Sequence, residues 1–116
     1  MLSQPQRSQL LTIARRSIET TLAGSRFTLE LGTIDAELQR PAGAFVSLHT
    51  HDGDLRGCIG TIQPVAPLCE AVANNAVNAA FRDPRFFPLR PEELARIHIE
   101  ISVMSPIETV EDVESI

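Results

Sequence analysis

The N-terminal part of the chain has the hydrophobic pattern of an amphipathic helix. Apolar side chains recur every three or four residues, at Leu10, Leu11, Ala14, Ile18 and Leu22. Ser3 and Gln6 have the spacing of a capping box, in which both side chains accept hydrogen bonds from backbone N–H groups at the helix start. Gly24 is a natural end, because a residue without Cβ readily adopts the left-handed conformation that closes a helix. We therefore predict a helix over residues 4–23.

A weakly patterned stretch and then a β-hairpin are predicted next. Residues 25–43 lack a regular pattern and are predicted to be loop, apart from a short helical turn near 34–38. Residues 44–50 and 55–62 are rich in the apolar and β-branched side chains that favour strands. Asp52-Gly53 between them is typical of a tight hairpin turn. The two segments should therefore pair as antiparallel strands.

The register of this hairpin decides which side chains share a face. Side chains alternate between the faces of a strand, and the two apolar faces coincide if Val46 lies opposite Ile59, which requires a two-residue turn. The pairs that follow are Ser47 with Cys58, His49 with Arg56 and His51 with Asp54. Arg56 and Cys58 then share the face away from the core. The alternative is a three-residue loop with a bulge, which would turn Cys58 towards the Val46 face instead.

The second half of the chain predicts a helix and a further strand. A stripe of small apolar residues at helical spacing comprises Leu68, Ala71, Val72, Ala76, Ala79 and Ala80. Asp83-Pro84 ends this helix, and residues 91–94 begin a short helical turn. Ile97, Ile99, Ile101 and Val103 alternate with polar residues, which indicates a strand with one buried face. The tail, residues 108–116, has apolar positions without a stop signal and is expected to belong to a further element.

Composition limits the classes of protein to which the chain can belong. Its 116 residues suffice for one domain, and 43% hydrophobic with 22% charged residues is typical of a globular protein. The net charge is -5 and the ten Arg residues are scattered, which argues against nucleic-acid binding. Two Cys residues form no disulfide framework or zinc pattern, and no apolar run is long enough for a membrane span. We expect a soluble, cytoplasmic protein.

Several side chains near the end of the second predicted helix are candidates for specific contacts. The Arg85 guanidinium suits carboxylates and phosphates. A structural ion pair, with Asp83 or Glu100, is the default interpretation, and a ligand anion is the alternative. Asn75 is unusual inside a helix and should make a hydrogen bond, either structural or in a site. Phe81, Phe86 and Phe87, with the neighbouring prolines, predict a packed corner, and a partner-binding patch is the alternative.

Motifs spread along nearly the whole chain resemble the AMMECR domain family, whose prokaryotic members are called AmmeMemoRadiSam system protein A. The motifs are residues 43–46 (GAFV), 55–61 (LRGCIGT), 75–76 (NA), 79–81 (AAF), 83–86 (DPRF) and 99–103 (IEISV). The resemblance implies an α+β domain with an antiparallel sheet, containing the 44–62 hairpin and flanked by helices. Family domains usually add a smaller subdomain, so we expect residues 1–116 to form a single AMMECR-like domain without the C-terminal part.

The resemblance also implies site residues and partners. The family motif is matched at Arg56, Gly57, Cys58, Gly60, Asn75, Asp83, Arg85, Phe86 and Glu100. Among these, the ligand-binding candidates are Arg56, Gly57, Gly60, Asn75 and Arg85. Prokaryotic members tend to be encoded with a Memo-like protein and a radical S-adenosylmethionine enzyme, which are therefore the implied partners.

Cys58 is the candidate catalytic residue. Its thiolate would be stabilised by Arg56, and His49 on the same face could accept the thiol proton as a base. The alternative is a small hydrophobic residue that packs in a crowded strand. His49 and His51, with Asp52 and Asp54, could share a metal ion, but such groups are also typical of a solvated hairpin tip. We expect neither a metal nor another cofactor.

Two functions of different classes follow. The first is a small-ligand-binding or catalytic module with its site at the strand 55–61. The second is a non-enzymatic adaptor that docks onto the Memo-like and radical S-adenosylmethionine proteins. Replacement of Cys58 by Ala should abolish activity under the first function if the thiol is catalytic, and should be nearly silent under the second.

Overall fold

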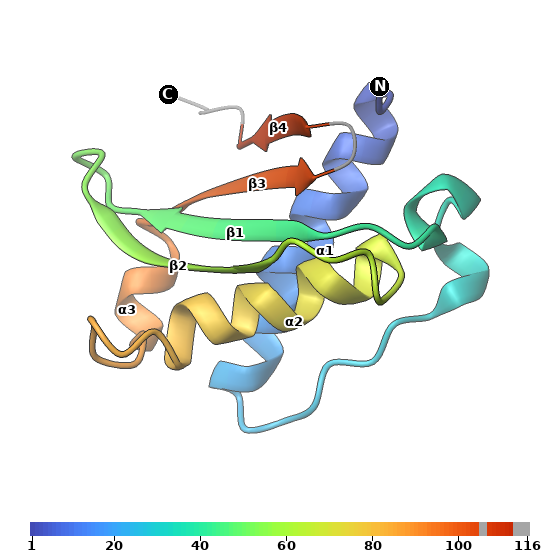
Figure 1. Ribbon diagram of the computed structural model, residues 1–116. Coiled ribbons are helices and arrows are strands. Elements are labelled where there is room, and N and C mark those ends of the chain that lie inside the picture. Colours follow the sequence, from blue (N-terminus) through green and yellow to red (C-terminus); the bar gives the residue numbers. More distant parts are fainter. Residues whose placement is uncertain (105–106, 113–116) are drawn as a thin grey trace.

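The computed structural model describes residues 1–104 and 107–112, which form an α+β domain around a four-stranded antiparallel sheet (Figure 1). The helical elements are α1 (Gln4–Leu22), η1 (Leu31–Thr33), η2 (Ala36–Gln39), α2 (Leu68–Phe81) and α3 (Pro91–Leu94). The strands are β1 (Ala44–His49), β2 (Leu55–Thr61), β3 (His98–Met104) and β4 (Ile107–Glu111). Their order in the sheet is β2-β1-β3-β4, so β2 and β4 are the outer strands. The predicted fold class is confirmed.

The first helix forms as predicted. The Ser3 N–H donates to Gln6 Oε1 over 2.8 Å, and the Gln6 N–H donates to Ser3 Oγ over 3.2 Å, which completes the capping box. The helix ends just before Gly24, whose φ is 81°. The loop that follows contains two 3₁₀ turns, η1 and η2, in place of the one turn predicted near 34–38.

The core lies between the sheet and the helices. In Figure 1 the sheet faces the viewer, α1 crosses behind it and α2 runs below β2. Fully buried core side chains include Leu10 and Ile18 of α1, Val46 and Leu48 of β1, Val72 of α2, and Ile101 of β3. The opposite face carries half-buried residues such as Ser47 and Cys58, and no described helix lies over it.

Close approach explains both glycines that flank Cys58. A Cβ at Gly57 would collide with the Ala79 carbonyl of α2, and a Cβ at Gly60 would collide with the Phe45 ring. The glycines therefore let a helix pack on one face of β2 and an aromatic ring lie against the other.

The hairpin register is confirmed in its centre and wrong at its tip. Val46 lies opposite Ile59 and Ser47 opposite Cys58, as predicted from the apolar faces. His49, however, lies opposite Leu55, because the register shifts after Leu48.

The shift arises because Arg56 is an extra residue in β2, opposite no single partner. The Thr50 N–H bonds to the Asp54 carbonyl over 2.8 Å, so the loop has three residues, 51–53, and His51 does not pair with Asp54. The alternative of a three-residue loop with a bulge is therefore the one that forms. The expectation that it would turn Cys58 towards the Val46 face is wrong, because the bulge offsets the extra loop residue and Cys58 stays opposite Ser47.

The C-terminal strands complete the sheet. β3 begins at His98 and alternates buried and half-buried residues, as predicted. β4 pairs with it and places Val110 opposite Ile101, so the tail does contribute a further element. Residues 113–116 of that tail lie outside the described residues. No helix in the described ranges is long and apolar enough to cross a bilayer.

Candidate functional site

The outer edge of β2 at Cys58 is bound by side chains from the segment after α2. The Cys58 N–H donates to Asp83 Oδ2 over 3.0 Å, and Arg85 Nη2 reaches the Cys58 carbonyl at 3.4 Å. Arg85 also forms a bidentate ion pair with Asp83, in which Nη2 donates to Oδ2 over 2.7 Å and Nε donates to Oδ1 over 3.0 Å. The default interpretation of Arg85, a structural ion pair, is confirmed, and Asp83 rather than Glu100 is its partner. The pair binds the backbone of the LRGCIGT strand.

Electrostatics fix this carboxylate in its charged form. The hydrogen bonds from Arg85 hold the pKa of Asp83 well below its usual range; burial opposes them, and the Cys58 N–H adds to the lowering. Asp83 in turn raises the pKa of Arg85. The Asp83 side chain is only 1% exposed, whereas that of Arg85 is 56% exposed, so the pair has a buried anion and an accessible cation.

The Cys58 thiol points away from α2, towards Ser47. The Ser47 hydroxyl lies 3.2 Å from Cys58 Sγ. No hydrogen bond joins the thiol to His49 within the ranges that the structure describes. The predicted hydrogen bond between Cys58 as nucleophile and His49 as base is therefore not formed in this structure. Catalysis by Cys58 stays a prediction.

The bulge directs Arg56 away from Cys58 and towards α3. Its guanidinium forms a fork to Glu93, with Nε to Oε2 at 2.8 Å and Nη2 to Oε1 at 3.2 Å. Arg56 Nη2 also donates to the Phe87 carbonyl over 2.8 Å. The hydrogen bonds from Arg56 lower the pKa of Glu93, against the effect of burial. The predicted sharing of a face by Arg56 and Cys58 is wrong, because the extra residue interrupts the alternation.

Phe86 brings the two arginines of the motifs together. The guanidinium carbons of Arg56 and Arg85 lie 5.7 and 5.5 Å from the centroid of its ring. Both distances are within the range of a cation–π contact. Two positive side chains from distant parts of the sequence are therefore held around one aromatic ring.

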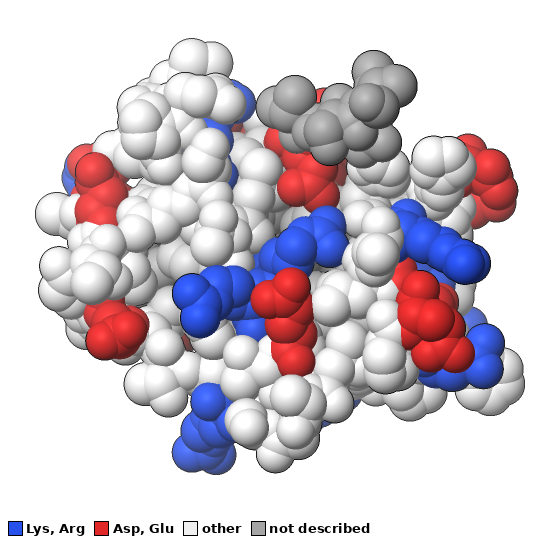
Figure 2. Space-filling view, turned by 180° about the vertical axis from the view of Figure 1, so that it is seen from behind, with Lys and Arg blue, Asp and Glu red and all other residues white. Residues whose placement is uncertain are grey.

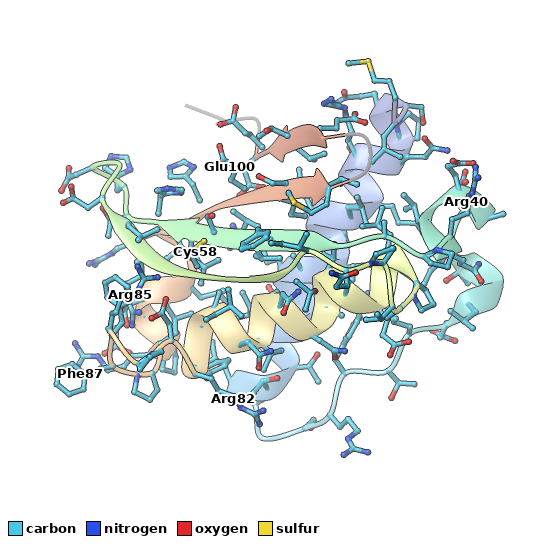
Figure 3. The ribbon with its side chains drawn as sticks, in the orientation of Figure 1. Arg40, Cys58, Arg82, Arg85, Phe87 and Glu100 are labelled. Atoms are coloured by element: carbon cyan, nitrogen blue, oxygen red, sulfur yellow. The ribbon has the colours of Figure 1, made fainter. Side chains whose placement is uncertain are left out.

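A pocket opens beside this arrangement. We call it the edge pocket: a cavity of about 660 Å³ lined by Arg56, Arg85, Arg90, Phe86, Phe87 and Glu93, with Pro88 between them. In Figure 3, Arg85 and Phe87 lie at the end of the molecule opposite Arg40. Phe87 is 90% exposed, so the packed corner predicted for the three aromatic residues is wrong at this position.

The remaining predicted ligand residues do not line the edge pocket. Asn75 is buried and its amide donates to the Ala44 carbonyl at 3.0 Å and to Thr61 Oγ1 at 3.1 Å, which ties α2 to the hairpin. Gly57 and Gly60 serve the close contacts described above. Conversely, Glu93 and Arg90 could not be predicted as site residues from the sequence, because only the bulge and the fold of the chain after α2 bring them to Arg56.

The three histidines gather at a second, smaller cavity. It measures about 330 Å³, and its lining includes His49, His51, His98, Glu100 and Glu111. A hydrogen bond with Glu111, together with burial, raises the pKa of Glu100, and an electrostatic interaction with His49 opposes this rise. Among the described residues, no three of the His, Cys, Asp and Glu side chains are placed to hold one metal ion.

Charges of both signs are mixed on one face of the molecule. On the face seen from behind in Figure 2, Arg side chains lie next to Asp and Glu side chains, and uncharged surface separates these groups. This distribution differs from the concentrated positive patch of a nucleic-acid-binding surface.

Sequence comparison relates this chain to a family of known proteins. A model of the AMMECR1 family matches residues 11–116. A protein of Aeropyrum pernix is 48% identical over 103 residues, covering 85% of this chain and 43% of that protein. A protein of Methanothermobacter thermautotrophicus is 43% identical over 110 residues, covering 95% of this chain and 57% of its own length.

A solved structure agrees with the sequence comparisons. The crystal structure of an uncharacterized protein from Pyrococcus horikoshii matches with a TM-score of 0.83 and 34% identity, over 88% of this chain and 52% of that one. The chain thus spans about half the length of these relatives. The match of both sequence and fold means that this chain belongs to the AMMECR1 family.

Proposed function

We propose that this chain is a small-ligand-binding module and that the edge pocket is its site. The observation that carries the proposal is the convergence of Arg56 and Arg85 on one cavity of about 660 Å³, a volume typical of small-molecule sites. Both side chains are preorganised, Arg56 by Glu93 and Arg85 by Asp83. Preorganised polar groups cost little further entropy when a ligand binds.

Binding is better supported than catalysis. The Cys58 thiol bonds with Ser47, on the sheet face that α2 does not cover, and Cys58 is not among the residues that line the edge pocket. Its carbonyl accepts a hydrogen bond from Arg85, a residue of the pocket wall. A nucleophilic role for Cys58 would need a ligand on that other face.

A thermal-shift screen against a library of metabolites tests the proposal. We expect some compounds to raise the melting temperature of the wild type, because a ligand that binds only the folded state stabilises it. Phe87→Ala should reduce these shifts. Val65→Ala is the matched control, since Val65 is also a highly exposed apolar residue, at 79%, and does not line the edge pocket. The proposal fails if no compound stabilises the wild type, or if both variants respond as it does.

One observation favours a second function, that of an adaptor. An aromatic side chain that is 90% exposed, as Phe87 is, resembles the anchors that dominate protein–protein interfaces. The family resemblance suggests a Memo-like protein and a radical S-adenosylmethionine enzyme of an AmmeMemoRadiSam system as the partners. A cytoplasmic location belongs to the same proposal and is supported by Cys58 and Cys69, which are both free thiols.

Co-purification distinguishes the two functions. An adaptor should retain the Memo-like or radical enzyme through affinity purification, and Phe87→Asp should release it while Val65→Asp does not. Retention of neither partner by the wild type would contradict the adaptor function.

A further inference from the structure

We infer that the edge pocket recognises an oxyanion, a carboxylate or a phosphate group, on a small molecule with a flat apolar body. The inference rests on the proposed function and specifies the class of ligand. Three sets of observations support it: the charge of the lining, the donors that have no acceptor, and the exposed aromatic wall.

The lining of the edge pocket is positive in a chain that is negative overall. It contains Arg56, Arg85 and Arg90 against the single acidic residue Glu93, while the whole chain carries a net charge of -5. Asp83 lies behind Arg85 and is nearly fully buried. Asp83 therefore positions Arg85 from behind, and Glu93 pairs with Arg56 in the wall itself. The exposed side chains of Arg85 and Arg90 are the positive groups that attract an incoming anion.

Several guanidinium nitrogens of the lining have no acceptor. Arg85 uses Nε and Nη2 for Asp83 and Cys58, and its Nη1 has no hydrogen-bond partner in the described part of the chain. The Arg90 side chain is 74% exposed, and its ion pair with Glu92 is long, at 4.0 Å between Nε and Oε2. These donors are available to an anion, and the planar guanidinium fork suits both carboxylate and phosphate oxygens.

Arg56 contributes in a different way. Its Nη1 is buried without any hydrogen-bond partner among the described residues, so it offers a ligand no direct contact. Its guanidinium is held at the wall of the pocket by the fork to Glu93, which balances its charge. Arg56 therefore shapes the wall, while Arg85 and Arg90 supply the hydrogen bonds to the anion.

The apolar part of the wall defines the rest of the ligand. Phe86, Phe87 and Pro88 lie along the same cavity, and Phe87 is 90% exposed. Flat rings stack on exposed aromatic side chains, so a planar apolar group next to the anion would cover this surface. With acidic residues at Glu92 and Glu93 beside the arginines, the site suits one or two negative charges rather than a polyanion.

Binding of three related probes tests the inference. Phenyl phosphate, benzoate and benzyl alcohol share a ring and differ in charge, and ligand-observed NMR at about 50 mM salt measures their affinities for the protein. We expect the better of the two anions to bind at least tenfold more tightly than the alcohol, because charge-assisted hydrogen bonds are absent from the neutral probe. The order of the two anions tells whether the group recognised is a phosphate or a carboxylate.

Arg90→Gln and Arg40→Gln form a matched pair of variants. Both arginine side chains are highly exposed, at 74% and 73%, and each forms an ion pair with an acidic residue close in sequence, Glu92 for Arg90 and Glu37 for Arg40. Arg40, however, lies at the opposite end of the molecule (Figure 3). We expect Arg90→Gln to weaken anion binding about three- to tenfold and to leave the alcohol unchanged, whereas Arg40→Gln should change neither.

The outcomes separate this inference from the proposed function. If benzyl alcohol binds as tightly as both anions, or if Arg90→Gln has no effect on anions, the oxyanion is not recognised and the inference is wrong. The edge pocket would still be a ligand site if Phe87→Ala weakens the neutral probe. If neither anion binds at all, the inference is also wrong, and the metabolite screen decides the proposed function on its own.

Discussion

The substitution Gly57→Ala gives a direct test of the packing between β2 and α2. The added methyl group would point at the Ala79 carbonyl, a backbone atom in the middle of the contact between helix and sheet. Neither backbone can easily move aside, because β2 is paired with β1 and α2 is buried along most of its length. The clash must therefore be relieved by a shift of the whole helix or strand.

The size of the effect follows from two opposing contributions. Overpacking of a core costs about 1–3 kcal/mol. Replacement of Gly by Ala reduces the entropy of the unfolded chain and returns about 0.4–1 kcal/mol. We expect a net loss of roughly 1.3 kcal/mol. An unfolding entropy of about 2.1 cal/mol/K per residue converts this loss to a fall of about 5 °C in Tm for a chain of this size.

Gly32→Ala is the matched control. No heavy atom lies within 4 Å of a Cβ placed at Gly32, and its φ is not positive. The same chemical change should therefore leave stability unchanged or raise it slightly there. Urea unfolding followed by circular dichroism measures both variants. If Gly57→Ala proved as stable as Gly32→Ala, the close approach of α2 would not be what requires a glycine in this motif.

Three further predictions concern residues of the site and its surroundings. Asn75→Ala should lower the free energy of unfolding, measured in urea, by about 1–3 kcal/mol, because the buried Ala44 carbonyl loses its donor. Asn74 is exposed, and Asn74→Ala should leave stability unchanged or raise it slightly. Equal effects of the two substitutions would contradict the role of the Asn75 amide. Arg56→Lys keeps the positive charge but loses the two-bond contact with Glu93 in α3, so it should destabilise the protein by about 1–2 kcal/mol. An unchanged midpoint of urea unfolding would contradict this expectation. The pKa of Glu100 is raised in the folded protein, so its contribution to stability is complete below its unfolded pKa and is lost as pH rises through its folded pKa. Glu100→Gln should therefore stabilise the protein at pH 7 relative to wild type, and much less at pH 4. An equal difference in stability at both pH values would refute the interaction between Glu100 and Glu111.

The elements and the centre of the hairpin could be predicted because they depend on local patterns. The apolar faces of β1 and β2 allow a core only when Val46 lies opposite Ile59, and that register is found. The pair of Asp83 with Arg85 was predictable for a similar reason, since the two residues are only two positions apart.

The tip of the hairpin and the walls of the edge pocket could not be predicted in this way. Asp52-Gly53 is compatible with loops of two or three residues, and nothing in residues 55–61 marks Arg56 as the bulged position. The fork from Arg56 to Glu93 joins residues far apart in the sequence, so it depends on the path of the chain after α2. Asn75 was expected to make a hydrogen bond, but only the packing of α2 decides that the bond is structural.

The binding of Asp83 and Arg85 along β2 has a consequence for how this sheet can meet other proteins. An outer strand with unsatisfied backbone groups invites a strand from another chain to pair with it, which leads to sheet extension or aggregation. At Cys58 the carboxylate already accepts the N–H and the guanidinium already donates to the carbonyl, so an intruding strand would have to displace a tight ion pair first. Intermolecular pairing at the middle of β2 is thereby opposed by side chains, without the protection of another strand.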